Sequence, residues 1–419
     1  GYVDPGDAGQ GGDGGCARAL ELFGKGRLAE AARVCEAGMR QDSGNHRFTY
    51  LLGRIFFTQA QELEKKQRND PEAAELFQRA KRMLLAAEAA SPGPLDSGLD
   101  HAVGSILLRE RRPHAAIDRF SRAIAKAPGN GTFHRLRGHT FLQLGDYEPA
   151  RGDLRAAVDL EPGNHSGRIW LAEALYLGGR IEGARESLWE YHGLLEGSPA
   201  DPRHSHVLYK IFEYALAANA LEEARRALEM GLALREEDPL LLVELGVLLY
   251  RLGEFERSME VLERLLAGGD GTEPRHRAEA HRHRGLAAQQ LGDHSLARVH
   301  LEKALEISPG HAPALRALAV SLRRLGDREG ARAAADRFKA ILPLEQRSQK
   351  LRERVAVDPG DHAARAELIE VYVAMDRRFE AAAELRTLRV RSPHFPALGA
   401  LVRKLSGEQA PGEPAGAGR

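Results

Sequence analysis

Histidine is the residue type in this sequence whose spacing comes nearest to a site for chemistry. Five histidines lie close together, and the neutral imidazole ring is the commonest metal ligand in proteins: His276, His281, His283, His294 and His300. His281 and His283 are two positions apart, and only residues three or four apart share one face of a helix. We therefore predict packed or solvated histidines, with no metal site and no cofactor.

Cysteine is the second residue type with reactive chemistry. Cys16 and Cys35 are the two cysteines of the chain, and no C-x-x-C segment is present, so zinc binding and haem attachment are not expected. Both cysteines fall within the first predicted helical hairpin, where they could face each other. A disulfide there would stabilise the fold by about 3 kcal/mol. The alternative is two free, half-buried thiols, and the sequence leaves both open.

The motifs of common catalytic sites are absent. The sequence contains no G-x-S-x-G, no G-x-x-x-x-G-K-[ST], no H-E-x-x-H and no glycine-rich dinucleotide loop. The segments that begin at Asn130 and Asn164 match the N-glycosylation sequon, but both fall in Pro-Gly-Asn connectors that a helical hairpin needs anyway. We therefore predict no catalytic residue and no enzymatic activity.

Composition argues against two classes of partner. Among 419 residues, Lys+Arg and Asp+Glu number 60 each, so no overall charge attracts nucleic acid or an anionic membrane. No apolar run approaches the roughly 18 residues of a membrane span. We expect no nucleic-acid partner and no membrane span within this chain. The chain begins at Gly1 without a methionine, which favours an exported location (periplasmic, envelope or extracellular) over a cytoplasmic one.

A period of 34 residues organises the elements that carry these side chains. Small residues recur at this spacing as Gly104 and Gly138, and again as Gly285 and Ala319. Each is followed 24 residues later by a proline. A fixed period of this length is typical of a stacked array of helical hairpins and not of a single compact core. We expect the small residues to lie where the two helices of a hairpin cross most closely.

The segment around Leu144 shows how one hairpin is built. Apolar residues recur every three or four positions before it, which predicts a helix. Gly145 can adopt the left-handed conformation that ends a helix, and Asp146 can cap the next one. The same order of features returns several times along the chain.

This order of features resembles the tetratricopeptide repeat family. The family's unit has Leu-Gly in its first helix, an alanine early in its second helix and a proline at its end. The matching alanines here are Ala116, Ala150, Ala184, Ala297 and Ala331. The resemblance covers residues 14–395 and implies an all-α fold: a right-handed α-solenoid of about ten helix-turn-helix repeats with a C-terminal capping helix.

The predicted boundaries follow from the period. We place the repeats at about residues 14–45, 46–92, 97–130, 131–164, 165–200, 204–238, 239–270, 276–311, 312–345 and 362–395, with the cap at 396–406. Residues 1–13 are expected to be a flexible leader and residues 407–419 a flexible tail. Residues 346–360 are expected to form an extra single helix. A charged insertion around residues 61–71 is expected to lengthen both helices of the second repeat.

The resemblance also implies where a partner binds. In this family the first helices line a concave groove that commonly holds an extended peptide or a helix of another protein. The candidate partner-binding residues on those helices are Arg135, His139, Trp170, Tyr176, Tyr209, Lys210, Tyr250, Arg251, Arg282, Arg316 and Arg324. The centre of this set is aromatic and its flanks are basic, which suits an acidic or extended segment. Some of these side chains could instead pack against the neighbouring hairpin.

We therefore expect a non-enzymatic scaffold or adaptor for protein–protein interaction. It would bind a partner protein in the groove and help to assemble a larger complex, for which a bacterial envelope is one setting. Some family members hold a chaperone C-terminus with a clamp that needs asparagines, and these are missing here. Two alternatives stay open: a structural subunit of an extracellular or envelope assembly held by its edges and terminal faces, or the non-catalytic arm of a modifying enzyme.

Overall fold

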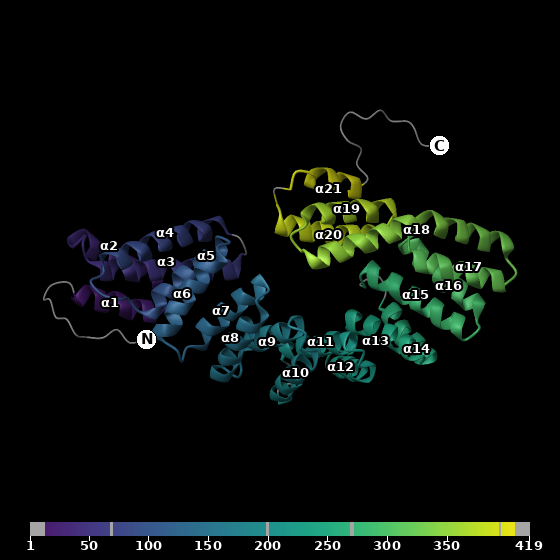
Figure 1. Ribbon diagram of the computed structural model, residues 1–419, viewed down its shortest axis with the longest axis horizontal. Coiled ribbons are helices and arrows are strands. Elements are labelled where there is room, and N and C mark those ends of the chain that lie inside the picture. The colour runs from purple at the N-terminus through teal and green to yellow at the C-terminus, as the bar shows by residue number, and fades with distance from the viewer. Residues whose placement is uncertain (1–12, 68–69, 198–200, 269–271, 394, 407–419) are drawn as a thin grey trace, which may run out of the picture. The chain divides into compact units, whose positions relative to one another are not determined.

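The computed structural model describes residues 13–67, 70–197, 201–268, 272–393 and 395–406. Over these residues the chain forms 21 α-helices and no β-strand (Figure 1). The predicted all-α fold is therefore confirmed. The predicted flexible tail and almost all of the predicted leader lie outside the described residues.

The chain divides into two compact units, Gly1–Ser198 and Pro199–Arg419. Each unit is a stack of helical hairpins in which consecutive helices pack in pairs. The hairpins of unit 1 are α1(Asp13–Gly24) with α2(Leu28–Gln41), α3(His46–Lys66) with α4(Pro71–Ala90), α5(Ser97–Arg109) with α6(Pro113–Lys126), α7(Gly131–Leu144) with α8(Tyr147–Leu160), and α9(His165–Leu177) with α10(Ile181–Leu195).

Unit 2 repeats this arrangement and ends in a single short helix. Its hairpins are α11(Pro202–Ala217) with α12(Leu221–Leu234), α13(Pro239–Leu252) with α14(Phe255–Ala267), α15(Pro274–Gln290) with α16(His294–Ile307), α17(Ala312–Arg324) with α18(Arg328–Val357), and α19(His362–Ala374) with α20(Arg378–Arg391). The last helix, α21(Leu398–Ser406), packs on α19 and α20 and buries Leu401, as expected of a cap.

The first helices of successive hairpins contact one another within each unit. In unit 1, α1 contacts α3, α3 contacts α5, and α7 contacts α9. In unit 2, α13 contacts α15, and α15 contacts α17. The second helices of the described hairpins make no comparable contacts with one another. The first helices therefore form the more closely packed layer of each stack, and this is the layer on which the sequence places the candidate binding residues.

Small residues set the distance between the helices of a hairpin. A Cβ atom at Gly138 would lie 2.8 Å from Cγ of Leu154 and 3.2 Å from the carbonyl oxygen of Ala150. A Cβ atom at Gly285 would meet Leu301 in the same way, at 2.7 Å from Cγ. Ordinary side chains do not fit at such distances, since protein interiors are close-packed. Both glycines lie at a helix crossing, as the period predicts.

The turns inside the hairpins use left-handed residues. Gly145 has φ 84°, which confirms its predicted role, and Gly253, Gly292 and Gly326 have φ values of 82°, 84° and 83°. Glycine adopts this conformation without the steric cost that a Cβ atom brings. The prediction for Asp146 is wrong in part, because it occupies the N-cap position of α8 but its side chain makes no capping hydrogen bond.

The two sequon-like asparagines are helix caps. Oδ1 of Asn130 accepts a hydrogen bond from the backbone N–H of Thr132 at 3.1 Å, at the start of α7. Oδ1 of Asn164 accepts one from the backbone N–H of Gly167 at 3.0 Å, at the start of α9. Such bonds satisfy backbone donors that have no partner within the helix, so both asparagines have a structural role.

The structure corrects one prediction about the elements of unit 2. Helix α18 runs without a break from Arg328 to Val357, with Pro343 inside it. The predicted repeat end at residue 345 and the separate helix at 346–360 are therefore wrong. Proline removes one backbone hydrogen bond from a helix interior, but Leu351 in the second half of α18 is buried in the core that α19 and α20 form. Tertiary packing holds the helix together across the proline.

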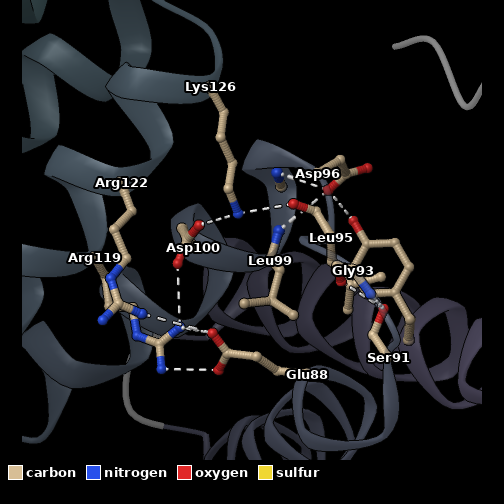
Figure 2. A network of polar contacts seen from close by, with 12 residues as sticks. Glu88, Ser91, Gly93, Leu95, Asp96, Leu99, Asp100, Arg119, Arg122 and Lys126 are labelled. Atoms are coloured by element: carbon tan, nitrogen blue, oxygen red, sulfur yellow. Dashed lines mark hydrogen bonds and ion pairs between the residues drawn. The ribbon is translucent and has the colours of Figure 1, made fainter.

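A buried charge network joins the second and third hairpins of unit 1 (Figure 2). Asp100 of α5 is fully buried. It accepts hydrogen bonds from Nη1 of Arg119 at 3.1 Å and from Nζ of Lys126 at 2.7 Å, both on α6. Arg119 also binds Glu88 of α4 with two nitrogens, at 2.8 and 2.9 Å. Three helices from two hairpins are therefore held by one set of opposite charges.

Candidate functional site

Three of the predicted binding residues meet on the first helices of unit 1. The ring of His139, from α7, stacks on that of Trp170, from α9, with centroids 3.9 Å apart and an interplanar angle of 17°. The Arg135 guanidinium, also from α7, lies 5.6 Å from the Trp170 ring centroid. All three side chains are half-buried. They form a flat aromatic surface with a cation beside it, here called the Trp170 cluster.

Burial also sets the charge of the Trp170 cluster. It lowers the pKa of His139, and the positive charge of Arg135 lowers it further. His139 is therefore neutral at pH 7, because its ordinary pKa is already about 6.5. The Arg135 guanidinium makes no ion pair with a carboxylate of the described residues, and its Nε is buried without a hydrogen-bond partner there. The charge of Glu161 acts on Arg135, but no described carboxylate lies at ion-pair distance from it.

The fourth predicted residue of unit 1, Tyr176, lies half-buried near the end of α9. Ring contacts join Arg135, His139 and Trp170. The other seven predicted residues lie in unit 2, on α11, α13, α15 and α17.

In unit 2, two of the predicted cations are already neutralised. Nζ of Lys210 binds Glu213, at 2.7 Å, on its own helix. The guanidinium of Arg282 binds Glu279 through two nitrogens, one of them at 3.0 Å. Burial raises the pKa of Glu279, but the hydrogen bond and charge of Arg282 outweigh this and lower it to about 2. These side chains contribute little free positive charge to a binding surface.

The remaining unit 2 residues differ in exposure. Arg251, Arg316 and Arg324 are exposed and form no ion pair with any described residue. The half-buried Tyr250 contacts other side chains, with its ring centroid 5.5 Å from that of Phe255 and 5.6 Å from that of His283. Tyr209 faces a cavity that sequence reasoning did not predict. The alternative of packing against a neighbour thus applies to Tyr250.

The unpredicted cavity lies among α11, α13, α15 and α20, all in unit 2, and has a volume of about 470 Å³. Its wall includes Glu244, Arg275, Ser308 and His311. None of these is among the candidate binding residues taken from the sequence. The one available signal was Glu244, a carboxylate in the middle of a mostly apolar helix. Hairpin packing brings the other three residues to it from separate elements.

The histidines of the eighth hairpin are packed among protein side chains. Nδ1 of His281 lies 3.0 Å from Nδ1 of His300. Burial lowers the pKa of both, and that of His283, to about 4. These three rings are therefore uncharged at neutral pH. Over the described ranges, no group of three or more His, Cys, Asp or Glu side chains could hold a metal ion.

The two cysteines are buried in the first hairpin and are not joined by a disulfide. Burial raises the pKa of the Cys35 thiol to about 12. The thiolate is the reactive form of cysteine, so Cys35 is protonated and unreactive at neutral pH. The structure therefore favours two separate thiols over a disulfide, but both are buried and not half-buried as expected.

No helix in the described segments has both the length and the apolar composition that crossing a membrane requires.

Comparison with known protein families gives a consistent match. Two tetratricopeptide repeat models match this chain, one over residues 16–93, 102–164, 135–191 and 209–273, and the other over residues 288–355. These segments include hairpins of both units. No curated protein matches the sequence.

Solved structures with a similar fold share little sequence with this chain. The C-terminal part of a TPR repeat-containing protein from Cytophaga hutchinsonii is 14% identical, with a TM-score of 0.45, over 72% of this chain and 99% of that chain. MamA from Desulfovibrio magneticus RS-1 is 17% identical, with a TM-score of 0.37, over 46% and 99%. YrrB, a TPR protein with an unusual peptide-binding site, is 18% identical, with a TM-score of 0.36, over 46% and 89%.

Proposed function

Because this chain belongs to the tetratricopeptide repeat family, we propose that it is a non-enzymatic scaffold that binds a segment of another protein on its first helices. Repeat stacks present extended surfaces, and function in such proteins lies mostly in contact. The Trp170 cluster is the observation that carries this proposal. It combines a half-buried aromatic surface on the predicted binding layer with a cation that forms no ion pair with a described carboxylate.

The chemistry of the Trp170 cluster favours an extended segment with an acidic side chain. Aromatic anchors and arginine dominate the energetics of protein interfaces. A guanidinium forms two parallel hydrogen bonds to a carboxylate, which gives direction as well as strength. Arg135 has no such partner within the described chain, and Trp170 offers a flat surface for the neighbouring residue of the segment.

Selection of peptides by the purified chain tests this proposal. We expect panning of a random-peptide phage library to enrich sequences that contain Asp or Glu. The selected peptides should lose about tenfold or more in affinity on Trp170→Ala and on Arg135→Gln, since a truncated anchor typically costs more than about 1.4 kcal/mol. The measurement is fluorescence anisotropy of labelled synthetic peptides.

The second tryptophan of the chain supplies a matched control. Trp189 is half-buried on α10, a second helix of a hairpin, where its ring contacts His192 edge to face. Trp189→Ala removes the same side chain outside the predicted binding layer and should leave peptide affinity unchanged. Equal losses for Trp170→Ala and Trp189→Ala, or enrichment of basic peptides that depend on Trp170, would contradict the proposal.

A further inference from the structure

The unit 2 cavity contains a carboxylate that forms no ion pair with the described residues. Glu244 projects from α13 and is half-buried. It forms neither an ion pair nor a hydrogen bond with any described residue, whereas the other two carboxylates of the wall are paired: Glu279 with Arg282, and Glu380 with Nε of Arg377 at 2.7 Å. Glu244 is therefore the acid of the cavity whose charge the protein does not compensate at hydrogen-bonding distance.

The surroundings of Glu244 make its charge costly. Burial raises its pKa, and the nearby negative charges of Glu279 and Glu213 raise it further, against the opposing charge of Arg275. Arg275 is exposed, and its guanidinium contacts His276 at 3.2 Å. A cation that entered the cavity would relieve this repulsion, because opposite charges at short range favour the ionised carboxylate.

A second polar group of the wall has unused hydrogen-bonding capacity. Ser308 is 5% exposed, and its Oγ has no hydrogen-bond partner in the described part of the chain. A buried hydroxyl without a partner is unfavourable, because it has lost its hydrogen bonds to water and gained none in the protein. Ser308 stands at the connection between α16 and α17, so it reaches the cavity from a different element than Glu244.

The histidine beside Ser308 does not add positive charge. Nδ1 of His311 accepts a hydrogen bond from the backbone N–H of Ala314 at 3.3 Å. The ring proton is therefore on Nε2. Burial and the charge of Arg282 lower the pKa of His311 to about 4, so the ring is neutral at pH 7.

The rest of the wall suits an aliphatic chain that ends in a cation. Tyr209 and Phe379 supply aromatic rings, and Leu240 and Val243 supply aliphatic surface. Long basic side chains bury their methylene groups against such surfaces and keep the charged end at a polar site. Aromatic faces also attract ammonium and guanidinium groups.

We propose that this cavity binds a lysine or arginine side chain of an extended partner segment, with Glu244 as the counter-ion. This inference rests on the proposed scaffold function, since the cavity opens on α11, α13 and α15, which belong to the predicted binding layer. The aliphatic part of the basic side chain packs between Tyr209 and Val243. Its cationic end binds Glu244, and the segment that carries it satisfies Ser308.

Short synthetic peptides test the proposal on the full chain. The probe is acetyl-Gly-Ala-Lys-Ala-Gly-amide, and its binding is measured by saturation-transfer NMR at low ionic strength. Replacement of the lysine by norleucine keeps the aliphatic chain and removes the charge, and we expect at least tenfold weaker binding. Replacement of the lysine by glutamate should abolish binding. These two comparisons use the unaltered protein and do not depend on the folding of a variant.

Protein variants then identify the counter-ion. Glu244→Gln should weaken binding of the lysine peptide about tenfold or more. Glu306→Gln, which removes an exposed carboxylate on α16, should leave it unchanged. Arg275→Gln should leave binding equal or tighter, because Arg275 repels the probe. Thermal melting of each variant confirms that it is folded.

Several outcomes would overturn the proposal. Equal binding of the norleucine peptide, or no effect of Glu244→Gln, would show that the cavity does not recognise a cation. Weaker binding in Arg275→Gln would indicate an anionic occupant. If butylamine binds as tightly as the peptide, the cavity recognises a free amine and not a side chain of a partner segment. If any of these occurs while Trp170→Ala still weakens binding of the phage-selected peptides, the scaffold function stands and this inference alone fails.

Discussion

At the scale of single residues, charge placement decides what the surface of this chain can bind. In the sequence, Arg135 and Arg282 are equivalent cations on first helices of their hairpins. The structure separates them, because Arg282 is held by Glu279 while Arg135 has no carboxylate partner among the described residues. Glu244 is the reverse case, a carboxylate on a first helix that forms no ion pair with a described cation. The two isolated charges lie in different units and call for opposite partner chemistry.

Asp100 allows a test of how much a buried ion pair stabilises the fold. Asp100→Asn keeps the size of the side chain but leaves Lys126 without its carboxylate partner. Removal of one member of a buried ion pair is strongly destabilising, so we expect a loss of about 2–4 kcal/mol in the free energy of unfolding. Urea denaturation followed by circular dichroism measures it. Asp159→Asn, on an exposed position of α8, should change stability by less than about 0.5 kcal/mol.

Buried histidines predict that acid destabilises the fold. Burial lowers the pKa of His101 to about 4, with Arg54 and Arg135 adding to the effect. The unfolded chain, with a histidine pKa near 6.5, then binds more protons than the folded chain between pH 6.5 and 4. Stability should therefore be fully present above pH 6.5 and fall as the pH drops towards 4.

A substitution at this position isolates the contribution of one histidine. The His101 ring packs between Phe57 and Phe133, with centroid distances of 5.8 and 5.5 Å, so His101→Phe suits its surroundings. When the pH falls from 7.5 to 5, the free energy of unfolding of this variant should decrease by about 1–2 kcal/mol less than that of the wild type. Identical pH profiles would show that His101 titrates normally in the folded chain.

At the scale of elements, each hairpin depends on one close crossing. Gly285→Leu would force its side chain into Leu301 and the backbone of Ala297, so we expect a loss of about 1–3 kcal/mol or more. Gly152 is a helical glycine with no atom within 4 Å of its built Cβ, and Gly152→Ala should stabilise α8 by about 1 kcal/mol. Thermal melting measures both effects. A Gly285→Leu variant that melts like the wild type would show that Gly285 does not lie at a close helix crossing.

The periodic elements were predictable because their signals are local. Helical spacing, a left-handed glycine such as Gly145 and small residues such as Gly138 act within one hairpin, and the structure confirms them. Pro343 shows the limit of this reasoning. A proline normally ends a helix, but Leu351 is packed against α19, and this contact with a later hairpin keeps α18 continuous. The sequence near Pro343 carries no sign of that contact.

At the scale of the whole molecule, stability comes from contacts between neighbouring hairpins along the chain. Each hairpin packs mainly on its neighbours in its own unit, so local damage should remain local, as in other repeat proteins. Helix α21 covers the apolar surface of the last hairpin through Leu401, which is 2% exposed.

Disruption of this cap tests whether damage to one hairpin stays confined to its neighbours. We expect Leu401→Asp to release α21 and to speed amide hydrogen exchange in α19 and α20, because the buried carboxylate has no partner there. Exchange in α3 and α5 of unit 1 should not change. Faster exchange throughout the chain would mean that the molecule unfolds as one cooperative body.

The sequence by itself determined the family, the all-α class, the number of hairpins and the layer on which the candidate binding residues lie. These follow from periodic spacing and from the small residues that every hairpin needs. Only the tertiary structure decided which of those residues are paired, since Arg282 and Lys210 bind carboxylates of their own helices and Tyr250 packs against Phe255 and His283, whereas Arg135 has no ion-pair partner among the described residues. It also brought Glu244, Ser308 and Arg275 together from separate elements. Helix periodicity is a local property, whereas charge pairing depends on which hairpin faces meet, and no spacing in the chain records that.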